Sequence, residues 1–359
     1  MDINKFNKIA TKNLLTIIDK GSCSHEEREI IMDILKRREI RIEKANQRVS
    51  ETDISKILKD KDLDWEIHLY PLACVSNTYE NDGVMENGSR SIYGVHETLH
   101  WPIRNDNDKL LGRFACSKDK PIMQNREMIE LGLRLANADD SEITFIRSIG
   151  EGESIILSIR AGQPVAVGPD KVQRYIYLLD NRTGEHGLRI GFGETTLRCQ
   201  NQLNFVKNDA AHKIRHTKNM KDKVEAVIEQ YDTLAEEIEV HNNFVLSLAA
   251  KTFDSETFDK AMYNFIALLT DVDLRDDFAN TRVPAGYDLA VVLCDCIFEE
   301  EKQIGRSLWT LLQGVTLLTT HKREVLYPRS EMPSLDYDIA YGKAGDLTSK
   351  AYQILTTLV

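Results

Sequence analysis

The spacing of hydrophobic residues changes character twice along the chain, and each change marks a predicted part of the fold. Over residues 1–60 the hydrophobic positions recur at helical spacing. From there to about residue 206 they alternate with polar residues every second position, and beyond it helical spacing returns. The pattern predicts an α+β fold. A helical N-terminal region (1–60) precedes an antiparallel β-rich core with one helix (61–206), and a helical C-terminal region (207–359) packs on that core.

A β-hairpin is predicted at the centre of the chain. Two strand-like segments, 173–179 and 188–197, flank a turn at 180–184, where Asp, Asn and Gly favour turn conformations. The other predicted elements of the core are strands at 63–72, 109–115, 141–149 and 153–160, a loop at 77–94 and a helix at 125–136. Strands joined by such short turns pair antiparallel, so we expect one antiparallel sheet.

A long amphipathic helix is predicted directly after the core, at 218–251. Its apolar stripe alternates spacings of three and four residues: Val224, Val227, Tyr231, Leu234, Ile238, His241, Val245 and Leu248. The stripe could pack on the sheet or on a second subunit, and we expect a homo-oligomer. Further helices are predicted at 256–270, 286–303, 305–321 and 343–358, with a loop at 327–337.

Composition and charge narrow the class of protein. The apolar fraction is 42% and the net charge is −11, which argues against a protein that binds nucleic acid by bulk attraction. A local basic patch on an acidic body stays possible. The six cysteines are scattered, the N-terminal residues lack the apolar segment of a secretory signal, and no run reaches transmembrane length. We therefore expect a soluble cytoplasmic protein with reduced thiols and no bound cofactor.

Positive charge is concentrated in one segment, 207–223. Six basic side chains oppose two acidic ones there: Lys207, Lys213, Arg215, Lys218, Lys221 and Lys223 against Asp209 and Asp222. The segment leads into the predicted long helix, whose first N–H groups favour anions. A phosphate backbone is one interpretation and an ordinary polar loop is the other.

The central hairpin adds arginines and aromatic residues to this candidate site. Tyr175 and Tyr177 share one strand face, and Arg174 lies on the other. Exposed tyrosines would stack on bases and arginines would bind phosphates, whereas buried tyrosines would be core residues. The candidate nucleic-acid-binding residues are Arg174, Tyr175, Tyr177, Arg189, Arg198, Lys213, Arg215, His216, Lys218 and Lys221.

One short match to an enzyme motif occurs at His96–His100, which satisfies H-E-x-x-H. In zinc proteases the two histidines lie on one helix face and bind the metal. Here Gly94 and Pro102 flank the match, so an extended segment is predicted, with the histidines too far apart to share a metal. The zinc-hydrolase hypothesis rests on this match alone, and we predict no metal site and no catalytic residues.

Several stretches resemble one known family. The pattern R-x-x-C-x-N-x-L stands at Arg198, Cys199, Asn201 and Leu203, and H-T-x-N stands at His216, Thr217 and Asn219. Weaker similarity covers 63–72, 103–115, 309–321 and 342–351. These residues resemble the phage/plasmid-like protein family, also described as domain of unknown function 932. The chain departs from the family pattern at Gln313, Gly314 and Leu317.

The resemblance implies a protein encoded by a phage or plasmid and located in the cytoplasm of a bacterial host. A role in DNA replication or recombination is the function it suggests. The order of hairpin, basic connection and long helix is also similar to that of single-strand annealing proteins, which implies single-stranded DNA as the partner. The alternative is a structural or assembly protein without affinity for nucleic acid.

Overall fold

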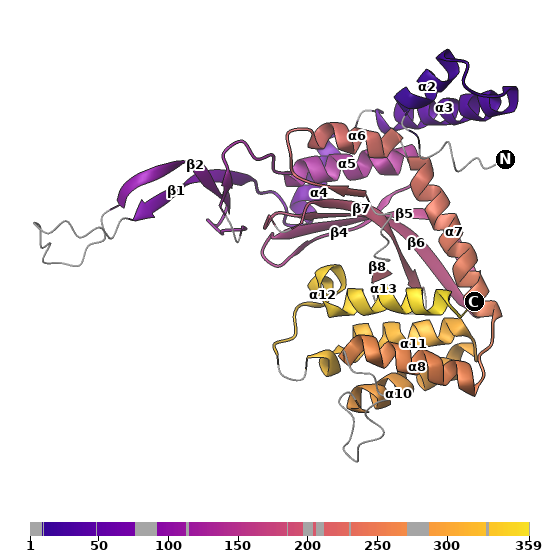
Figure 1. The fold of residues 1–359 in the computed structure, drawn as a ribbon. Coiled ribbons are helices and arrows are strands. Elements are labelled where there is room, and N and C mark those ends of the chain that lie inside the picture. Colours follow the sequence, from indigo (N-terminus) through magenta and orange to yellow (C-terminus); the bar gives the residue numbers. More distant parts are fainter. Residues whose placement is uncertain are drawn as a thin grey trace, which may run out of the picture.

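The computed structural model describes residues 9, 11–47, 49–75, 92–112, 115–184, 186–196, 204–205, 212–229, 231–270, 287–327 and 330–358. Its centre is a six-stranded antiparallel sheet in the order β4-β5-β6-β7-β8, with β9 also pairing with β7. The strands are β4 (Ile143–Ile149), β5 (Ser154–Val167), β6 (Asp170–Asn181), β7 (Leu188–Thr196), β8 (Asn204–Phe205) and β9 (His212–Ile214). Helices pack against this sheet (Figure 1), which confirms the predicted α+β class and antiparallel core.

A second, smaller sheet projects from the body as a ribbon (Figure 1). It consists of β1 (Ile67–Val75), β2 (Ile92–Arg104) and β3 (Cys116–Ser117). The strand predicted at 109–115 is wrong. Its described residues form a loop in which only Leu110 bridges to Ile103. Asp108 has a φ of 58°, and this left-handed turn folds the next residues back onto the end of β2.

Three helices cover one part of the sheet: α4 (Glu51–Asp60), α5 (Asn125–Ala138) and α6 (Met220–Glu229). Alternate residues of the central strands face them, such as Ile155, Leu157 and Ile159 of β5. These side chains are fully buried and share one core with Ile176 and Leu178 of β6. The two-residue period predicted from the sequence therefore reflects burial on one face of the sheet.

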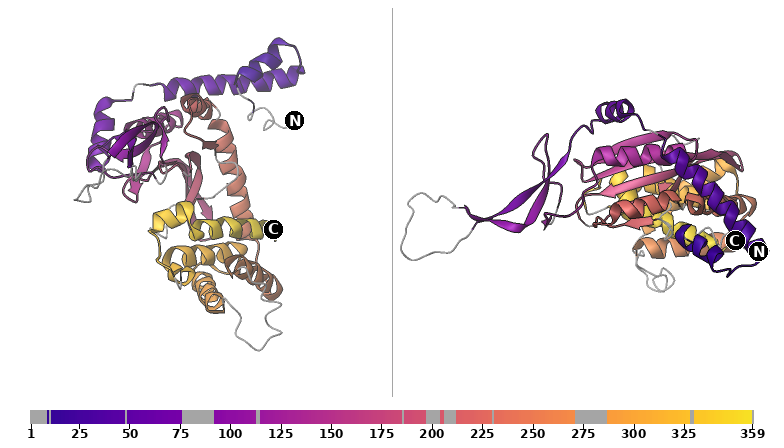
Figure 2. Two further views of the ribbon diagram at one scale, coloured as in Figure 1. Left: turned by 60° about the vertical axis from the view of Figure 1, so that its left-hand side comes forward. Right: turned by 90° about the horizontal axis from the view of Figure 1, so that it is seen from above.

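The C-terminal helices form a second layer with its own core (Figures 1 and 2). They are α7 (Tyr231–Ala250), α8 (Ser255–Thr270), α10 (Tyr287–Ile304), α11 (Leu308–His321), α12 (Leu335–Tyr341) and α13 (Lys343–Thr356), with a 3-10 helix at Arg323–Leu326. Buried Trp309 fastens this layer to the sheet, because its Nε1 donates to Asp170 Oδ2 at 3.1 Å. The helices predicted here are confirmed, whereas α12 occupies part of a predicted loop.

The single helix predicted at 218–251 is instead two helices, α6 and α7, which run in different directions (Figure 1). Gln230, between them, lies outside the described residues. The apolar stripe divides accordingly. Val224 and Val227 enter the core beneath α5, and Val245 and Leu248 enter the C-terminal core. The change of direction lets one continuous apolar stripe serve two cores.

The N-terminal helices α2 (Thr11–Asp19) and α3 (His25–Ala45) form a hairpin that stands out from the body (Figure 2). Ser24 caps α3, and its side chain and that of Glu27 each accept from the other's backbone N–H.

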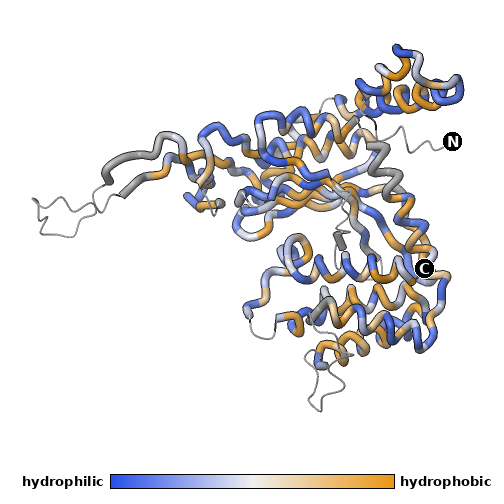
Figure 3. The backbone as a smooth tube through the Cα atoms, viewed as in Figure 1, coloured by the Kyte–Doolittle hydropathy of each residue, from blue (hydrophilic) through white to orange (hydrophobic). Residues whose placement is uncertain are grey.

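Hydrophilic and hydrophobic positions alternate along the helices (Figure 3). Within the described ranges, no helix is both long and apolar enough to cross a membrane. The domain division at residues 60 and 206 stays a prediction.

Candidate anion-binding pocket

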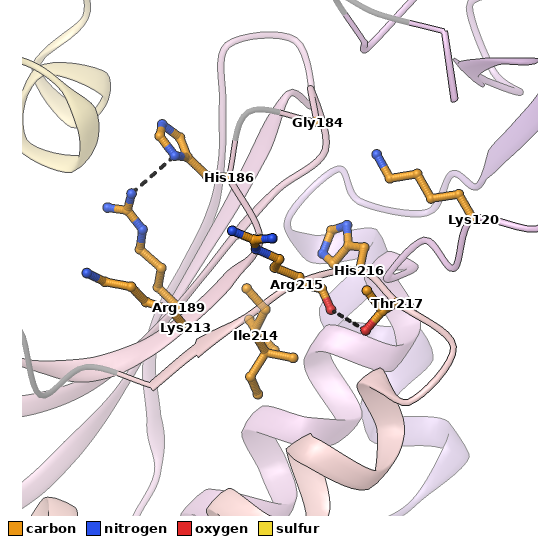
Figure 4. Close-up of a pocket in the computed structure, with 11 residues that line it drawn as sticks. Lys120, Gly184, His186, Arg189, Lys213, Ile214, Arg215, His216 and Thr217 are labelled. Carbon is orange, nitrogen blue, oxygen red and sulfur yellow. Dashed lines mark hydrogen bonds between the residues drawn. The ribbon is translucent and has the colours of Figure 1, made fainter. Parts of the chain in front are cut away.

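A pocket of about 530 Å³ opens where the β6–β7 turn meets β9 and the start of α6 (Figure 4). Three separate segments form its wall: a loop before α5, the turn itself, and the chain from β9 into α6. The lining residues are Lys120, Gly184, His186, Gly187, Leu188, Arg189, Lys213, Ile214, Arg215, His216 and Thr217. The volume falls in the range of sites that hold small ligands.

Two glycines allow the backbone to close around this pocket. Gly184 has a φ of 95°, a conformation that L side chains rarely adopt. A Cβ on Gly187 would lie 2.1 Å from the carbonyl oxygen of Ile214, so the turn and β9 are in direct backbone contact. The hairpin sequence thus brings the turn against a strand that is some thirty residues away.

The pairing of β7 with β9 sets two cations opposite each other. Arg189 is the cross-strand partner of Lys213 in the antiparallel register. Like charges in directly opposed positions destabilise a sheet. A pair of this kind is maintained at an energetic cost, and an anionic ligand between the side chains would remove that cost.

The charge of the pocket is strongly positive. Lys120, Arg189, Lys213 and Arg215 line it, and no aspartate or glutamate is among the lining residues that the structure describes. Within the described part of the chain, none of these four side chains forms an ion pair, whereas Lys44, Arg126 and Arg134 elsewhere on the surface each contact a carboxylate. Glu185, between Gly184 and His186, lies outside the described residues.

A buried carboxylate orients one wall of the pocket. His216 Nε2 lies 2.7 Å from Oδ1 of Asp180, and Arg182 Nε donates to the other oxygen at 3.3 Å. Asp180 is fully buried and the His216 side chain is only 4% exposed. Burial lowers the pKa of Arg182, with Asp180 acting against this shift. The guanidinium of Arg182 also lies 5.3 Å from the ring centre of Trp65.

The second histidine of the pocket is held by an aromatic side chain from the C-terminal layer. The ring of His186 stacks on Tyr341 with centroids 5.1 Å apart, and Arg189 Nη2 lies 3.2 Å from His186 Nδ1. Burial raises the pKa of Tyr341 to about 12. The phenol therefore stays neutral and adds no negative charge beside the basic residues.

The structure brings together four of the ten residues predicted from the sequence, namely Arg189, Lys213, Arg215 and His216. Lys218 and Lys221 are exposed at the start of α6, outside the lining, and Lys221 lies 3.5 Å from Glu127. Arg198 falls outside the described residues. Among the lysine, arginine and histidine residues of the lining, sequence reasoning missed two. His186 could have been found from its place in the predicted turn, whereas nothing in the sequence marks Lys120.

Two predicted ligand contacts do not fit the structure. Tyr177 is 3% exposed and packs under α12, and burial raises its pKa to about 12. Arg174 is 1% exposed. Both belong to β6, which lies between β5 and β7 and is covered by helices. Tyr175 is half-buried. The core interpretation of Tyr177 is therefore correct, and base stacking on this pair of tyrosines is not available.

Arg174 belongs to a buried charge network instead. Its Nη1 lies 2.7 Å from Oε2 of Glu194, although none of its N–H groups is aligned for a hydrogen bond with an acceptor in the described part. Glu194 also contacts His241 of α7, at 3.1 Å, and accepts from the hydroxyl of Tyr352 of α13. Although burial opposes ionisation, Arg174 and His241 lower the pKa of Glu194 to about 2. The network ties the sheet to two C-terminal helices.

The H-E-x-x-H match lies on an extended strand. His96, Glu97 and His100 all fall within β2, which confirms the predicted extended segment. Over four strand residues the two histidine Cα atoms are about 13 Å apart, too far for a shared metal ion. Among the residues described, no group of three or more His, Cys, Asp and Glu is placed to hold a metal.

A family model described as "Domain of unknown function (DUF932)" matches residues 116–343, more than half of the chain. The chain belongs to the DUF932 family. The match includes every described lining residue of the pocket. It begins after residues 63–72 and 103–115, so these two stretches of weaker resemblance lie outside it. No curated protein and no solved structure matches the chain significantly.

The H-T-x-N pattern supplies two residues to the wall of the pocket. His216 and Thr217 line it, and the Thr217 hydroxyl donates to Asn219 Oδ1 at 2.7 Å. The other pattern, from Arg198 to Leu203, lies outside the described residues. The local resemblance to DUF932 thus coincides with the wall of the basic pocket.

Proposed function

We propose that this DUF932 protein binds nucleic acid, with single-stranded DNA as the ligand, through phosphate contacts in the basic pocket. One observation carries the proposal: four cationic side chains converge from three segments, and none of them has a carboxylate partner in the described residues. Arg189 and Lys213 even face each other across β7 and β9. Such an arrangement is stabilised by a polyanion.

The position of the pocket on an acidic chain supports specific rather than bulk attraction. The net charge of −11 repels nucleic acid from most of the surface. Only a local field from Lys120, Lys213 and Arg215 would draw a strand to one place. Contacts of this kind are made to phosphates, so the proposal implies weak base preference and strong salt dependence.

The proposal also covers the biological role of the protein. A part in replication or recombination of a phage or plasmid, in the cytoplasm of a bacterial host, is the role that the family resemblance favours. Annealing of complementary strands also requires that several copies act together, and we extend the proposal to a homo-oligomer. Neither extension is needed for binding itself.

Fluorescence anisotropy of a labelled single-stranded oligonucleotide tests the proposal. We expect Lys213→Ala/Arg215→Ala to weaken binding by more than tenfold, because each lost charged contact is worth about 1.5 kcal/mol or more. The matched control is Lys36→Ala/Lys302→Ala, which removes the same charge from exposed positions on α3 and α10. Equal affinity of both double variants would reject the pocket as the binding site.

Assembly without nucleic-acid binding is the second candidate function. Three large hydrophobic side chains are exposed on the projecting α2–α3 hairpin: Leu15, Met32 and Ile40, at 47%, 53% and 46%. Apolar surface on a protruding element is typical of a contact with another chain. Light scattering that shows a large assembly, in a protein that binds no oligonucleotide at low salt, would favour this function over the first.

A further inference from the structure

We infer that the basic pocket takes a terminal phosphate, the phosphomonoester at the end of a strand or on a mononucleotide, in preference to an internal phosphodiester. The inference rests on the proposed function and names the group that the same pocket selects. Three observations carry it: the density of positive charge, the shape of the pocket, and the position of His216.

The charge of the pocket matches a dianion better than a monoanion. Four Lys and Arg side chains share about 530 Å³. An internal phosphodiester carries one negative charge and two non-bridging oxygens. A monoester carries between 1.5 and 2 negative charges near neutral pH, and three oxygens that accept hydrogen bonds. A monoester therefore supplies more charge and more acceptors in the same space.

The cationic groups come from three segments that meet at one pocket, rather than from one strand or helix. Figure 4 shows Arg215 in the middle, with His186, Arg189 and Lys213 to one side of it and His216 and Lys120 to the other. The Lys120 ammonium lies beside the turn, since a Cβ on Gly184 would be 3.5 Å from its Nζ. A single strand that runs across a protein surface contacts a row of cations along a groove. Cations from three segments that line one pocket instead suit a group that enters it from one end.

His216 supplies a feature that only a monoester can use. Its Nε2 is engaged by the buried Asp180 carboxylate at 2.7 Å, so Nδ1 is its other hydrogen-bonding atom. A phosphate monoester has an ionisable P–O–H group whose second pKa is near 6, so its oxygens can accept from Nδ1 or donate to it. A diester has no P–O–H group and can only accept. His216 is thus a specificity residue for the terminal group.

The test compares short oligonucleotides of one sequence, internally labelled, that differ only at their ends. One has hydroxyl ends, one a 5′-phosphate and one a 3′-phosphate, and thymidine monophosphate serves as competitor at constant ionic strength. We expect at least one phosphorylated end to bind about tenfold more tightly than the hydroxyl form, the effect of one added charge-assisted contact. Thymidine monophosphate should displace that strand.

Two variants assign the effect to the pocket. Lys120→Ala should abolish the preference for the phosphorylated end. Lys218→Ala, which removes an exposed charge just outside the lining, should weaken all three strands equally and leave the preference intact. His216→Gln, which keeps a polar side chain, should reduce the preference without loss of the folded state seen by circular dichroism.

The outcomes separate the inference from the proposed function. Equal affinity of all three strands overturns the terminal-phosphate inference and leaves nucleic-acid binding in place. Saturable binding of thymidine monophosphate that Lys120→Ala removes, with no binding of any strand, overturns nucleic-acid binding and supports a mononucleotide pocket. Failure of every probe to bind at low salt overturns both.

Discussion

His216 Nε2 lies 2.7 Å from Oδ1 of Asp180, and this contact joins the inside of the sheet to the wall of the basic pocket. Asp180 is the last buried carboxylate of β6 before the turn, and its two oxygens contact His216 and Arg182. The contact spans 36 residues of sequence. A single carboxylate therefore fixes both the hairpin turn and the start of the basic segment.

We predict that Asp180→Asn lowers the free energy of unfolding by about 3–5 kcal/mol. The substitution leaves Arg182, which is fully buried, without its opposing charge. Urea denaturation measures the effect. The control is Asp106→Asn, which breaks the more exposed Asp106–Arg104 pair and should cost less than about 1 kcal/mol. Similar losses in the two variants would contradict a structural role for Asp180.

Glu194 gives the protein an acid-sensitive contact. Its pKa is about 2 in the folded state, below the ordinary value of 4.5, with Arg174 and His241 favouring the charged form against the effect of burial. A carboxyl group of lowered pKa contributes stability that is complete above pH 4.5 and is lost as pH falls through about 2. Wild-type stability should therefore fall between these pH values.

Glu194→Gln should remove that part of the acid dependence and lower the free energy of unfolding at pH 7 by about 3–5 kcal/mol, because it leaves Arg174 buried and unpaired. Denaturation curves at pH 7, 5, 4 and 3 test both statements. If the variant and the wild-type protein lose stability in parallel from pH 5 to pH 3, Glu194 is not the responsible group.

Gly187→Ala should destabilise the protein by more than about 1 kcal/mol, because the new Cβ would lie 2.1 Å from the carbonyl oxygen of Ile214. The clash separates β9 from β7, so we also expect weaker oligonucleotide binding. Gly21→Ala is the comparison, since it places a Cβ in open space and adds only the strain of a positive φ. An unchanged melting temperature for Gly187→Ala would show that β9 is not held in this register.

Much of the fold could be predicted from hydrophobic spacing alone. The strands from Ile143 to Thr196 and the helix at Asn125 have strong local patterns, and turn residues mark their ends. The bend between α6 and α7 could not be predicted, because one uninterrupted stripe supplies two cores. The prediction of a strand at 109–115 is wrong because Asp108 adopts a left-handed backbone conformation, which changes the direction of the chain.

The candidate site could be predicted only in part, and the reason is burial. Alternation shows which residues of β6 share a face, but not that helices cover both faces. Arg174 and Tyr177 are therefore buried, although the pattern allows them to contact a ligand. The basic segment was visible as composition, and it supplies Lys213, Arg215 and His216 to the pocket. Lys120 joins them only through the tertiary fold, from a loop distant in sequence.

The salt dependence of oligonucleotide binding tests the central claim most directly. We predict that the logarithm of the binding constant falls linearly with the logarithm of salt concentration. Lys213→Ala/Arg215→Ala should make that slope shallower by about 1.4, since each phosphate contact to a single strand contributes about 0.7. The Lys36→Ala/Lys302→Ala control should keep the wild-type slope. A slope unchanged by loss of Lys213 and Arg215 would contradict phosphate binding in this pocket.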